Sequence, residues 1–307
     1  MIRRLAVLAA VGIAANAVAG PAGREAFVFT SLAGDARSAA LGIPAGALLE
    51  GEGALFANPA GAPLALQYSA GITHLAWTDG FFGETLGTMF PVGTEAAVGI
   101  AGFLFTHDAV NVTSEVLPDG TGALARPLGV EATILGAAFA FEDLSVGAAV
   151  HVVHEQEGDV RREGMALDLG CVWFPDPVIA VGLDMRGFGG PILPSASRDP
   201  FPLSFDASVR YEAEEVLPVP FRVYAGASLP LWGPSGGGLA AEFGDYFGAS
   251  VRGMLELREK GVLGWAFGIG GHRDQWNLDY TFAPAGDLGW AHRIGLTLKF
   301  TRKLKPA

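Results

Sequence analysis

Short segments in which apolar and polar side chains alternate dominate this chain. The clearest, WAHRIGLTLKF at residues 290 to 300, has one face that includes Trp290 and Phe300 and an opposite face that includes Arg293. A β-strand places successive side chains on opposite faces, so this pattern predicts a strand with one apolar and one polar side. No run of about 18 consecutive apolar residues follows the N-terminal leader, which leaves no candidate transmembrane helix.

Fourteen segments of this kind follow one another from residue 64 onward. They lie near 64–76, 80–91, 94–106, 109–117, 128–142, 144–157, 161–174, 177–186, 202–213, 219–229, 246–258, 262–271, 274–283 and 289–301, with longer connections near 118–127, 187–201 and 230–245. An even number of strands of about ten residues is typical of a closed bacterial outer-membrane barrel. We therefore predict an all-β fold, a transmembrane antiparallel β-barrel of about 14 strands over residues 64–301, with the last strand paired to the first.

Composition favours the membrane over a soluble alternative. Half of the 307 residues are hydrophobic, 17% are charged, and the mean hydropathy is +0.36. Aromatic residues lie near strand ends, where the interface girdles of a membrane barrel are expected. They are Trp77, Trp173, Trp232, Trp276, Trp290, Tyr211, Phe282 and Phe300. Periodicity alone does not separate this reading from a soluble secreted β-sandwich, whose apolar faces would form a core.

The first residues predict export. Arg3 and Arg4 precede an apolar stretch and the small residues 17–19, so residues 1–19 read as a signal peptide, with an N-terminal membrane anchor as the alternative. Removing them changes the net charge from −12 to −14, which excludes nucleic acid as a partner. We expect localisation in a bacterial outer membrane, in contact with its lipid. A short basic tail, residues 302–307, ends the chain.

Residues 20–63 differ from the rest, because they are rich in Ala and Gly and lack alternation. Asp35 to Leu41 is predicted to form a short helix, with Asp35 as its candidate N-cap. The segment is too apolar for a free tail, so we predict a plug inside the barrel lumen. Arg37 is a cation in an otherwise small and apolar stretch, and we expect it to pair with a lumen carboxylate and tether the plug.

The polar faces of the strands predict a charged lumen. The candidate inward-facing residues are Asp168, Asp206, Arg210, Arg252, Glu256, Asp279, Arg293 and Lys299. If the last hairpin turns near Gly286, Asp279 lies opposite Arg293. These residues are interpreted either as ion pairs that hold plug and barrel together or as a polar path or ligand site.

No catalytic or metal site is predicted. His151 and His154 are three residues apart, which on a strand directs them to opposite faces. Cys171 is the only cysteine, so it has no internal disulfide partner, and it reads as a small apolar residue. We expect a protein that is not an enzyme and needs no cofactor.

Two motifs resemble a known family. Residues 35–63 read DARSAALGIPAGALLEGEGALFANPAGAP and end in an aromatic-x-Asn-Pro-Ala-Gly element formed by Phe56, Asn58, Pro59, Ala60 and Gly61. Residues 278–300 carry Asp279-Tyr280, Leu288-Gly289 and His292-Arg293. Together they resemble the two ends of PorV/PorQ-type outer-membrane proteins. This resemblance implies a fourteen-stranded barrel similar to the FadL transporters, with the N-terminal segment in the lumen, and a family that includes a type IX secretion shuttle.

These observations leave two functions open for a membrane barrel. The first is transport of hydrophobic small molecules, or a PorV-like accessory role with components of a secretion system, in which the plug gates the lumen. The second is a structural or partner-binding barrel whose lumen stays closed.

Overall fold

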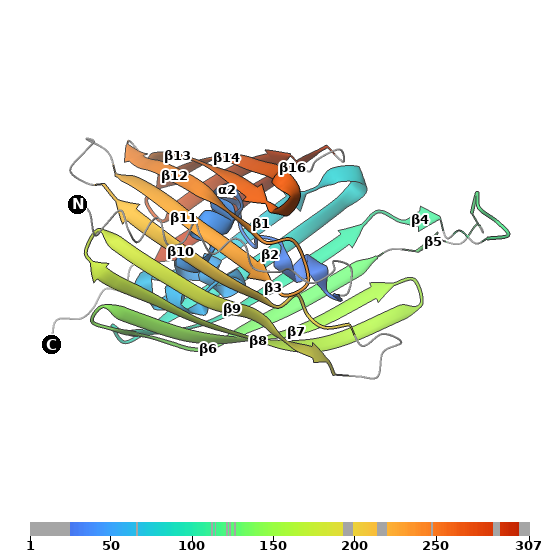
Figure 1. The fold of residues 1–307 in the computed structure, drawn as a ribbon, viewed down its shortest axis with the longest axis horizontal. Helices are drawn as coiled ribbons and strands as arrows, with labels where there is room; N and C mark the ends of the chain where they lie inside the picture. The colour runs from blue at the N-terminus through green and yellow to red at the C-terminus, as the bar shows by residue number, and fades with distance from the viewer. Residues whose placement is uncertain are drawn as a thin grey trace.

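The computed structural model describes residues 25–300, apart from residues 66, 112, 114, 121, 123, 126, 193–198, 214–219, 247 and 285–288. Its main feature is one antiparallel sheet of fourteen strands that closes into a barrel (Figure 1). The predicted signal peptide, residues 1–19, and the basic tail, residues 302–307, lie outside the described residues. No helix in the described part of the chain is long and apolar enough to cross a membrane.

The strands of the barrel follow the order of the chain almost throughout. They are β1 Tyr68–Ala76, β2 Phe81–Val92, β3 Ala96–His107, β6 Leu128–Phe141, β7 Leu144–Glu157, β8 Val160–Asp176, β9 Ile179–Pro191, β10 Ser204–Glu212, β11 Phe221–Pro230, β12 Gly236–Tyr246, β13 Ala249–Arg258, β14 Val262–Arg273, β15 Trp276–Pro284 and β16 Trp290–Phe300. Two short strands, β4 Val110–Asn111 and β5 Leu124–Ala125, form a ribbon that projects beyond the barrel wall (Figure 1).

The last strand closes the sheet, as predicted. β16 pairs with β1 in an antiparallel register that runs from Tyr68 opposite Phe300 to Ala76 opposite His292. Closure leaves no row of unpaired backbone groups at an edge, because every strand has two neighbours. A β-sandwich has open edges, so the closed sheet rules out the soluble sandwich alternative.

The predicted number of strands is confirmed, but two assignments are wrong. The described part of residues 109–117 contributes β4 and no barrel strand, because β4 pairs with β5 and not with the wall. Residues 230–245 were expected to form a loop, yet they contain most of β12. Its sequence begins GGGLAA, and three successive glycines carry no side chains that could display an apolar–polar alternation.

The two faces of the barrel wall are inverted relative to a soluble protein. Large apolar side chains point outward, as with Leu86 (60% exposed) and Leu239 (62%). Charged side chains point inward and are buried, among them Glu131, Asp168, Asp184, Asp206, Glu242, Arg252, Glu256 and Arg293. This is the distribution expected of a barrel whose outer surface meets hydrocarbon.

The two ends of the barrel differ in their connections. At one end, here called the turn end, β1 starts, β16 finishes, and β6–β7, β8–β9 and β14–β15 are joined by two residues each. At the other, the loop end, lie the long connection from β3 to β6 and the one from β9 to β10. In bacterial outer-membrane barrels the short turns face the periplasm and the long loops face outward.

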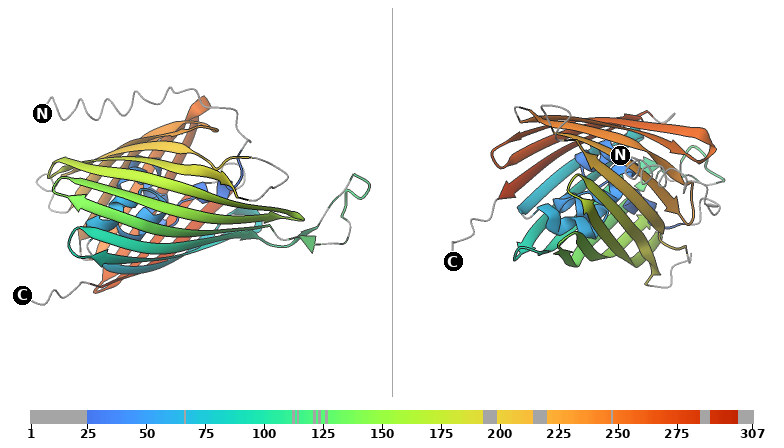
Figure 2. Two further views of the ribbon diagram at one scale, coloured as in Figure 1. Left: turned by 90° about the horizontal axis from the view of Figure 1, so that it is seen from below. Right: turned by 60° about the vertical axis from the view of Figure 1, so that its left-hand side comes forward.

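The N-terminal segment fills the lumen, as Figure 2 shows in two views. It consists of the 3-10 helix η2 Val28–Ser31, the helix α2 Ala36–Ala45 and the 3-10 helices η3 Gly46–Leu48, η4 Gly51–Phe56 and η5 Pro59–Ala65. Asp35 caps α2, because its side chain accepts a hydrogen bond from the Ser38 backbone N–H at 2.7 Å. Residues 25–65 are called the plug below.

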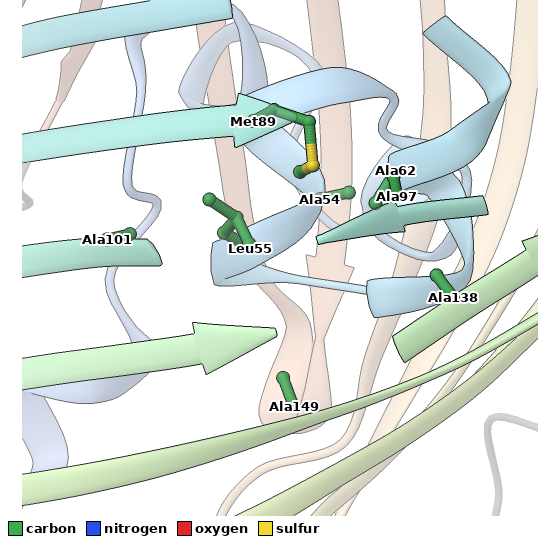
Figure 3. Close-up of a cluster of buried hydrophobic side chains, with 8 residues drawn as sticks. All are labelled: Ala54, Leu55, Ala62, Met89, Ala97, Ala101, Ala138 and Ala149. Atoms are coloured by element: carbon green, nitrogen blue, oxygen red, sulfur yellow. The ribbon is translucent and has the colours of Figure 1, made fainter. Parts of the chain in front are cut away.

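Small side chains pack the plug against the wall (Figure 3). The cluster consists of Ala54, Leu55 and Ala62 from the plug and Met89, Ala97, Ala101, Ala138 and Ala149 from the wall. Alanine and glycine allow plug and strands to approach closely, which is one role of the 44 glycines of the chain.

Candidate functional site in the barrel lumen

A buried ion pair joins the plug to the wall. The Arg37 guanidinium, on α2, donates two hydrogen bonds to the Glu242 carboxylate on β12, at 2.9 and 2.7 Å. Glu242 lies also 3.1 Å from Arg252 Nε and accepts a hydrogen bond from the Tyr224 hydroxyl at 3.3 Å. Arg252 continues the chain of charges to Asp279 on β15. A bidentate arginine–carboxylate pair fixes geometry as well as charge.

Further polar contacts tie the middle of the plug to β10 and β13. Arg210 Nη1 donates to Glu50 Oε1 at 2.7 Å, and Glu256 Oε1 accepts from the Ile43 backbone N–H at 2.8 Å. Burial disfavours the charged form of Glu50, but the positive charges of Arg210 and Arg37 outweigh it and lower the pKa of this carboxyl. Burial raises the pKa of Asp35, which has no basic side chain bonded to it.

Asn58 anchors the other half of the plug. Its side chain is fully buried, and its amide donates to Ala47 O at 2.9 Å and to Cys171 O and Leu183 O at 3.3 Å each. Its carbonyl oxygen accepts from the Ala60 backbone N–H at 3.0 Å. One side chain thus joins the plug to β8 and β9.

Three wall glycines make room for this anchor. A Cβ on Gly170 would overlap the Asn58 side chain, and a Cβ on Gly182 would overlap the Ala47 carbonyl. A Cβ on Gly147 would lie 2.5 Å from the plug backbone. These positions, on β8, β9 and β7, form a flat surface on which the plug backbone rests, here called the glycine platform.

A cavity of about 380 Å³ opens between the plug and the wall at the turn end. Both signs of charge line it, from the plug (Asp35, Arg37, Glu50, Glu52) and from the wall (Arg222, Glu242, Arg252, Asp279, Lys299). Because charged side chains of both plug and wall surround it, this cavity is called the turn-end chamber below.

Aromatic side chains from the plug and the wall pack together at the loop end of the lumen. Phe27 stacks on Phe201 with ring centroids 4.5 Å apart, and Phe29 lies 5.9 Å from Phe103 and 6.3 Å from Phe105. These five rings are called the aromatic cluster. A small cavity of about 30 Å³ lies beneath it and shares no lining residue with the turn-end chamber. The plug thus contributes Phe27 and Phe29 to an aromatic cluster at the loop end and charged side chains to the turn-end chamber.

A second group of charges borders the small cavity. His151 lies between two carboxylates, with Nδ1 2.7 Å from Glu131 and Nε2 2.9 Å from Asp168. Arg186 contacts Asp206 Oδ2 through Nη2 at 2.8 Å and Asp184 Oδ2 through Nε at 3.4 Å. Five of these six groups lie on inward positions of β6 to β9, and Asp206 is on β10.

The structure places all eight predicted lumen residues on inward faces, but one predicted pair does not form. Asp279 lies opposite Gly295, and Arg293 lies opposite Thr281. The register is thus shifted by two residues relative to the predicted pairing, and the turn itself lies outside the described residues. A shift of two keeps every side chain on its face, so alternation does not reveal it. Asp279 pairs with Arg252 instead.

Several residues that shape the lumen were not among the predicted ones. Glu242 lies on the unrecognised strand β12, so its partnership with Arg37 was not visible. Asp184, Arg186 and Glu131 stand on inward positions of recognised strands, where alternation alone could have identified them. His151 points inward and His154 outward, as their spacing predicts. The described residues contain no group of three or more ligating side chains placed to hold a metal ion.

The sequence matches no protein-family model, and no curated protein is similar to it. Solved structures with the same fold include the toluene transporter TodX of Pseudomonas putida (TM-score 0.61, 12% identity, covering 92% of this chain and 99% of that one). They also include the toluene transporter TbuX of Ralstonia pickettii (0.60, 14%, 86% and 97%) and a FadL homologue of Pseudomonas aeruginosa (0.50, 9%, 86% and 96%). This chain therefore shares the fold of FadL-like transporter barrels.

Proposed function

We propose that this protein is an outer-membrane barrel that passes hydrophobic small molecules and that the plug gates its lumen. The observation that carries this proposal is the aromatic cluster that plug and wall form at the loop end of the lumen, separated by the rest of the plug from the charge-lined chamber at the turn end. An apolar solute is attracted to the aromatic cluster at the loop end, because burying its surface there removes it from water. The toluene transporters that share this fold support the same class of solute.

The finer assignment remains part of the proposal. The residues of the N-terminal PorV/PorQ-type motif lie in the plug, where Asn58 and Pro59 contact the wall, so this motif supports a plug of common design rather than a particular cargo. A secretion-accessory role would require a docking surface for protein components, for which the projecting ribbon at β4 and β5 is the most prominent feature. We propose export by residues 1–19 and residence in the outer membrane on the sequence pattern and the apolar exterior.

A reversible cross-link tests the gate. A Cβ on Gly295 would lie 3.5 Å from Ala36 Cβ, a separation that a disulfide bridges, although Thr73 must rotate to make room. The variant Ala36→Cys/Gly295→Cys, in a Cys171→Ala background, joins α2 to β16. Uptake of labelled toluene is measured in cells of a host without such a transporter. We expect oxidation to lower uptake to the level of the empty host and reduction to restore it.

Each outcome separates the two functions. Uptake by the wild-type barrel that is blocked by the cross-link supports a gated transporter. Uptake equal in oxidised and reduced variants contradicts the gate, because the path then bypasses α2. No uptake above the empty host for the wild type contradicts transport and favours the barrel with a permanently closed lumen. The single variants Ala36→Cys and Gly295→Cys are the controls for the substitutions themselves.

A further inference from the structure

Two buried carboxyl groups face each other in the barrel wall. Asp184 on β9 and Asp206 on β10 are direct cross-strand partners, and both point into the lumen. They are 7% exposed each. One guanidinium, that of Arg186, contacts both, which places the two carboxyl groups within a few ångströms of each other. Two ionised carboxylates at this separation in a buried site repel each other strongly.

Their surroundings do not supply enough positive charge. β8 contributes Asp168, β6 contributes Glu131, and the basic groups are His151 and Arg186. Both ring nitrogens of His151 meet a carboxylate, so the ring is engaged as a cation between these two acids. Among the described residues, Arg186 alone remains for Asp184 and Asp206.

The remaining neighbours are uncharged. On β11, Ser228 lies opposite Asp206, and the plug residues nearest these strands, Ala47 and Asn58, carry no charge. One oxygen of each carboxyl, Oδ1 of Asp184 and Oδ1 of Asp206, is buried and has no hydrogen-bond partner in the described part of the chain. A buried carboxylate oxygen without a partner is costly, and a proton between the two groups would satisfy both.

A larger cation does not fit here. The small cavity nearby is lined by Asp168 and Arg186, but neither Asp184 nor Asp206 lines it or the turn-end chamber. A proton needs no cavity. We propose that Asp184 and Asp206 share one proton at neutral pH and that this proton keeps the plug docked on the glycine platform.

The carboxyl pair is linked to the plug through neighbouring residues of the same sheet. Asp184 lies opposite Gly170, the platform residue that receives the Asn58 side chain, and Asn58 bonds the carbonyl of Leu183, the residue before Asp184. Two residues along the strands from the Asp184–Asp206 pair, Gly182 lies opposite Ser208. The Ser208 hydroxyl accepts a hydrogen bond from the Ala47 backbone N–H at 3.2 Å. Loss of the shared proton adds a negative charge beside this anchor, and repulsion between the strands widens the platform.

Two measurements on the purified full-length protein test the proposal, and neither requires transport. Infrared difference spectroscopy detects the carbonyl stretch of a protonated carboxyl group, and hydrogen exchange followed by mass spectrometry reports protection of residues 43–60. In the wild type we expect the protonated-carboxyl band to disappear as the pH is raised above neutral. Protection of residues 43–60, corrected for the intrinsic pH dependence of exchange, should fall at least tenfold over the same range.

Replacing either aspartate by the uncharged asparagine of the same shape distinguishes this shared proton from other groups that titrate in the same pH range. Asp184→Asn and Asp206→Asn should each remove the band and keep residues 43–60 protected through the alkaline range, because an amide donates where the shared proton did. Glu163→Gln, at an exposed outward position, should behave as the wild type. The proposal is overturned if both Asn variants retain the band, if the wild type has none, or if the loss of protection at alkaline pH is the same in all proteins. Barrel formation is checked in each by heat-modifiable gel mobility.

Discussion

At the level of single residues, charged side chains hold a plug made mostly of small and apolar residues against the charged wall of the lumen. Arg37 is 28% exposed as a side chain while Glu242 is 8% exposed, so their pair is shielded from solvent on the acid side. Glu242 keeps Arg252 and Tyr224 as partners when Arg37 is removed. Loss of Arg37 therefore leaves Glu242 paired within the wall and weakens the attachment of the plug.

Replacing Arg37 tests this tether. Arg37→Ala removes two charge-assisted hydrogen bonds, so the free energy that holds α2 against β12 should fall by about 1.5–3 kcal/mol. Limited proteolysis of the detergent-solubilised barrel should cleave residues 25–65 faster than in the wild type. Arg258→Ala is the matched control, because its half-exposed guanidinium contacts the wall residue Glu256 at the loop end. Equal cleavage rates in the two variants would contradict the tether.

At the scale of elements, the plug and the wall fit because the wall gives up side chains where the plug approaches. The glycine platform belongs to three successive strands, and the plug backbone at Ala47, Pro59 and Ala60 rests on it. The same positions weaken the alternation by which strands are recognised, as the three glycines at the start of β12 show. Close packing of the plug and a clear strand pattern are thus competing demands on the same residues.

One methyl group tests the platform. Gly170→Ala places a Cβ in the space of the Asn58 side chain, which must move or leave its three acceptors. Overpacking of this kind costs about 1–3 kcal/mol, and we expect faster hydrogen exchange in residues 46–60. Gly190→Ala on β9 is the control, since its Cβ meets no atom within 4 Å. Unchanged exchange in Gly170→Ala would show that Asn58 has room to adapt.

At the level of the whole molecule, the barrel has its charged side chains inside and its large apolar side chains outside. Its buried residues include many charges, whereas Leu86, Leu239 and Leu263 are more than half exposed. In water this apolar surface would cause aggregation. In a bilayer it stabilises the barrel, because the outward apolar side chains contact hydrocarbon instead of water. The polar residues of the lumen are screened from lipid by the same wall.

A charge on the outer surface tests this orientation. Leu86→Arg, in the middle of β2, should lower the free energy of unfolding from lipid bilayers by about 2–4 kcal/mol, since the guanidinium would enter hydrocarbon. Val92, at the end of the same strand, also points outward, but it lies near the membrane surface. Val92→Arg should therefore lower the free energy of unfolding by only about 0–1 kcal/mol. Equal costs at both positions would contradict a lipid-facing exterior.

The sequence by itself determined the class of the fold and the facing of most residues. A period of two assigns each side chain to a face without any knowledge of partners, which is why Asp206 and Arg252 could be placed inward and β16 could be matched to β1. The distinct composition of residues 20–63 likewise indicated a segment to be enclosed. What alternation cannot express is register: a shift of two residues changes every partner and no face, so Asp279 was paired with the wrong arginine.

Only the tertiary structure decided which groups meet. Arg37 was expected to find a carboxylate, but Glu242 lies 205 residues away on a strand that its glycines conceal. The facing pair Asp184 and Asp206 depends on the alignment of β9 with β10 across a long connection, whose closure the local sequence does not constrain. Curvature of the closed sheet and the volume of the plug bring these residues together, and both are properties of the whole barrel rather than of any segment.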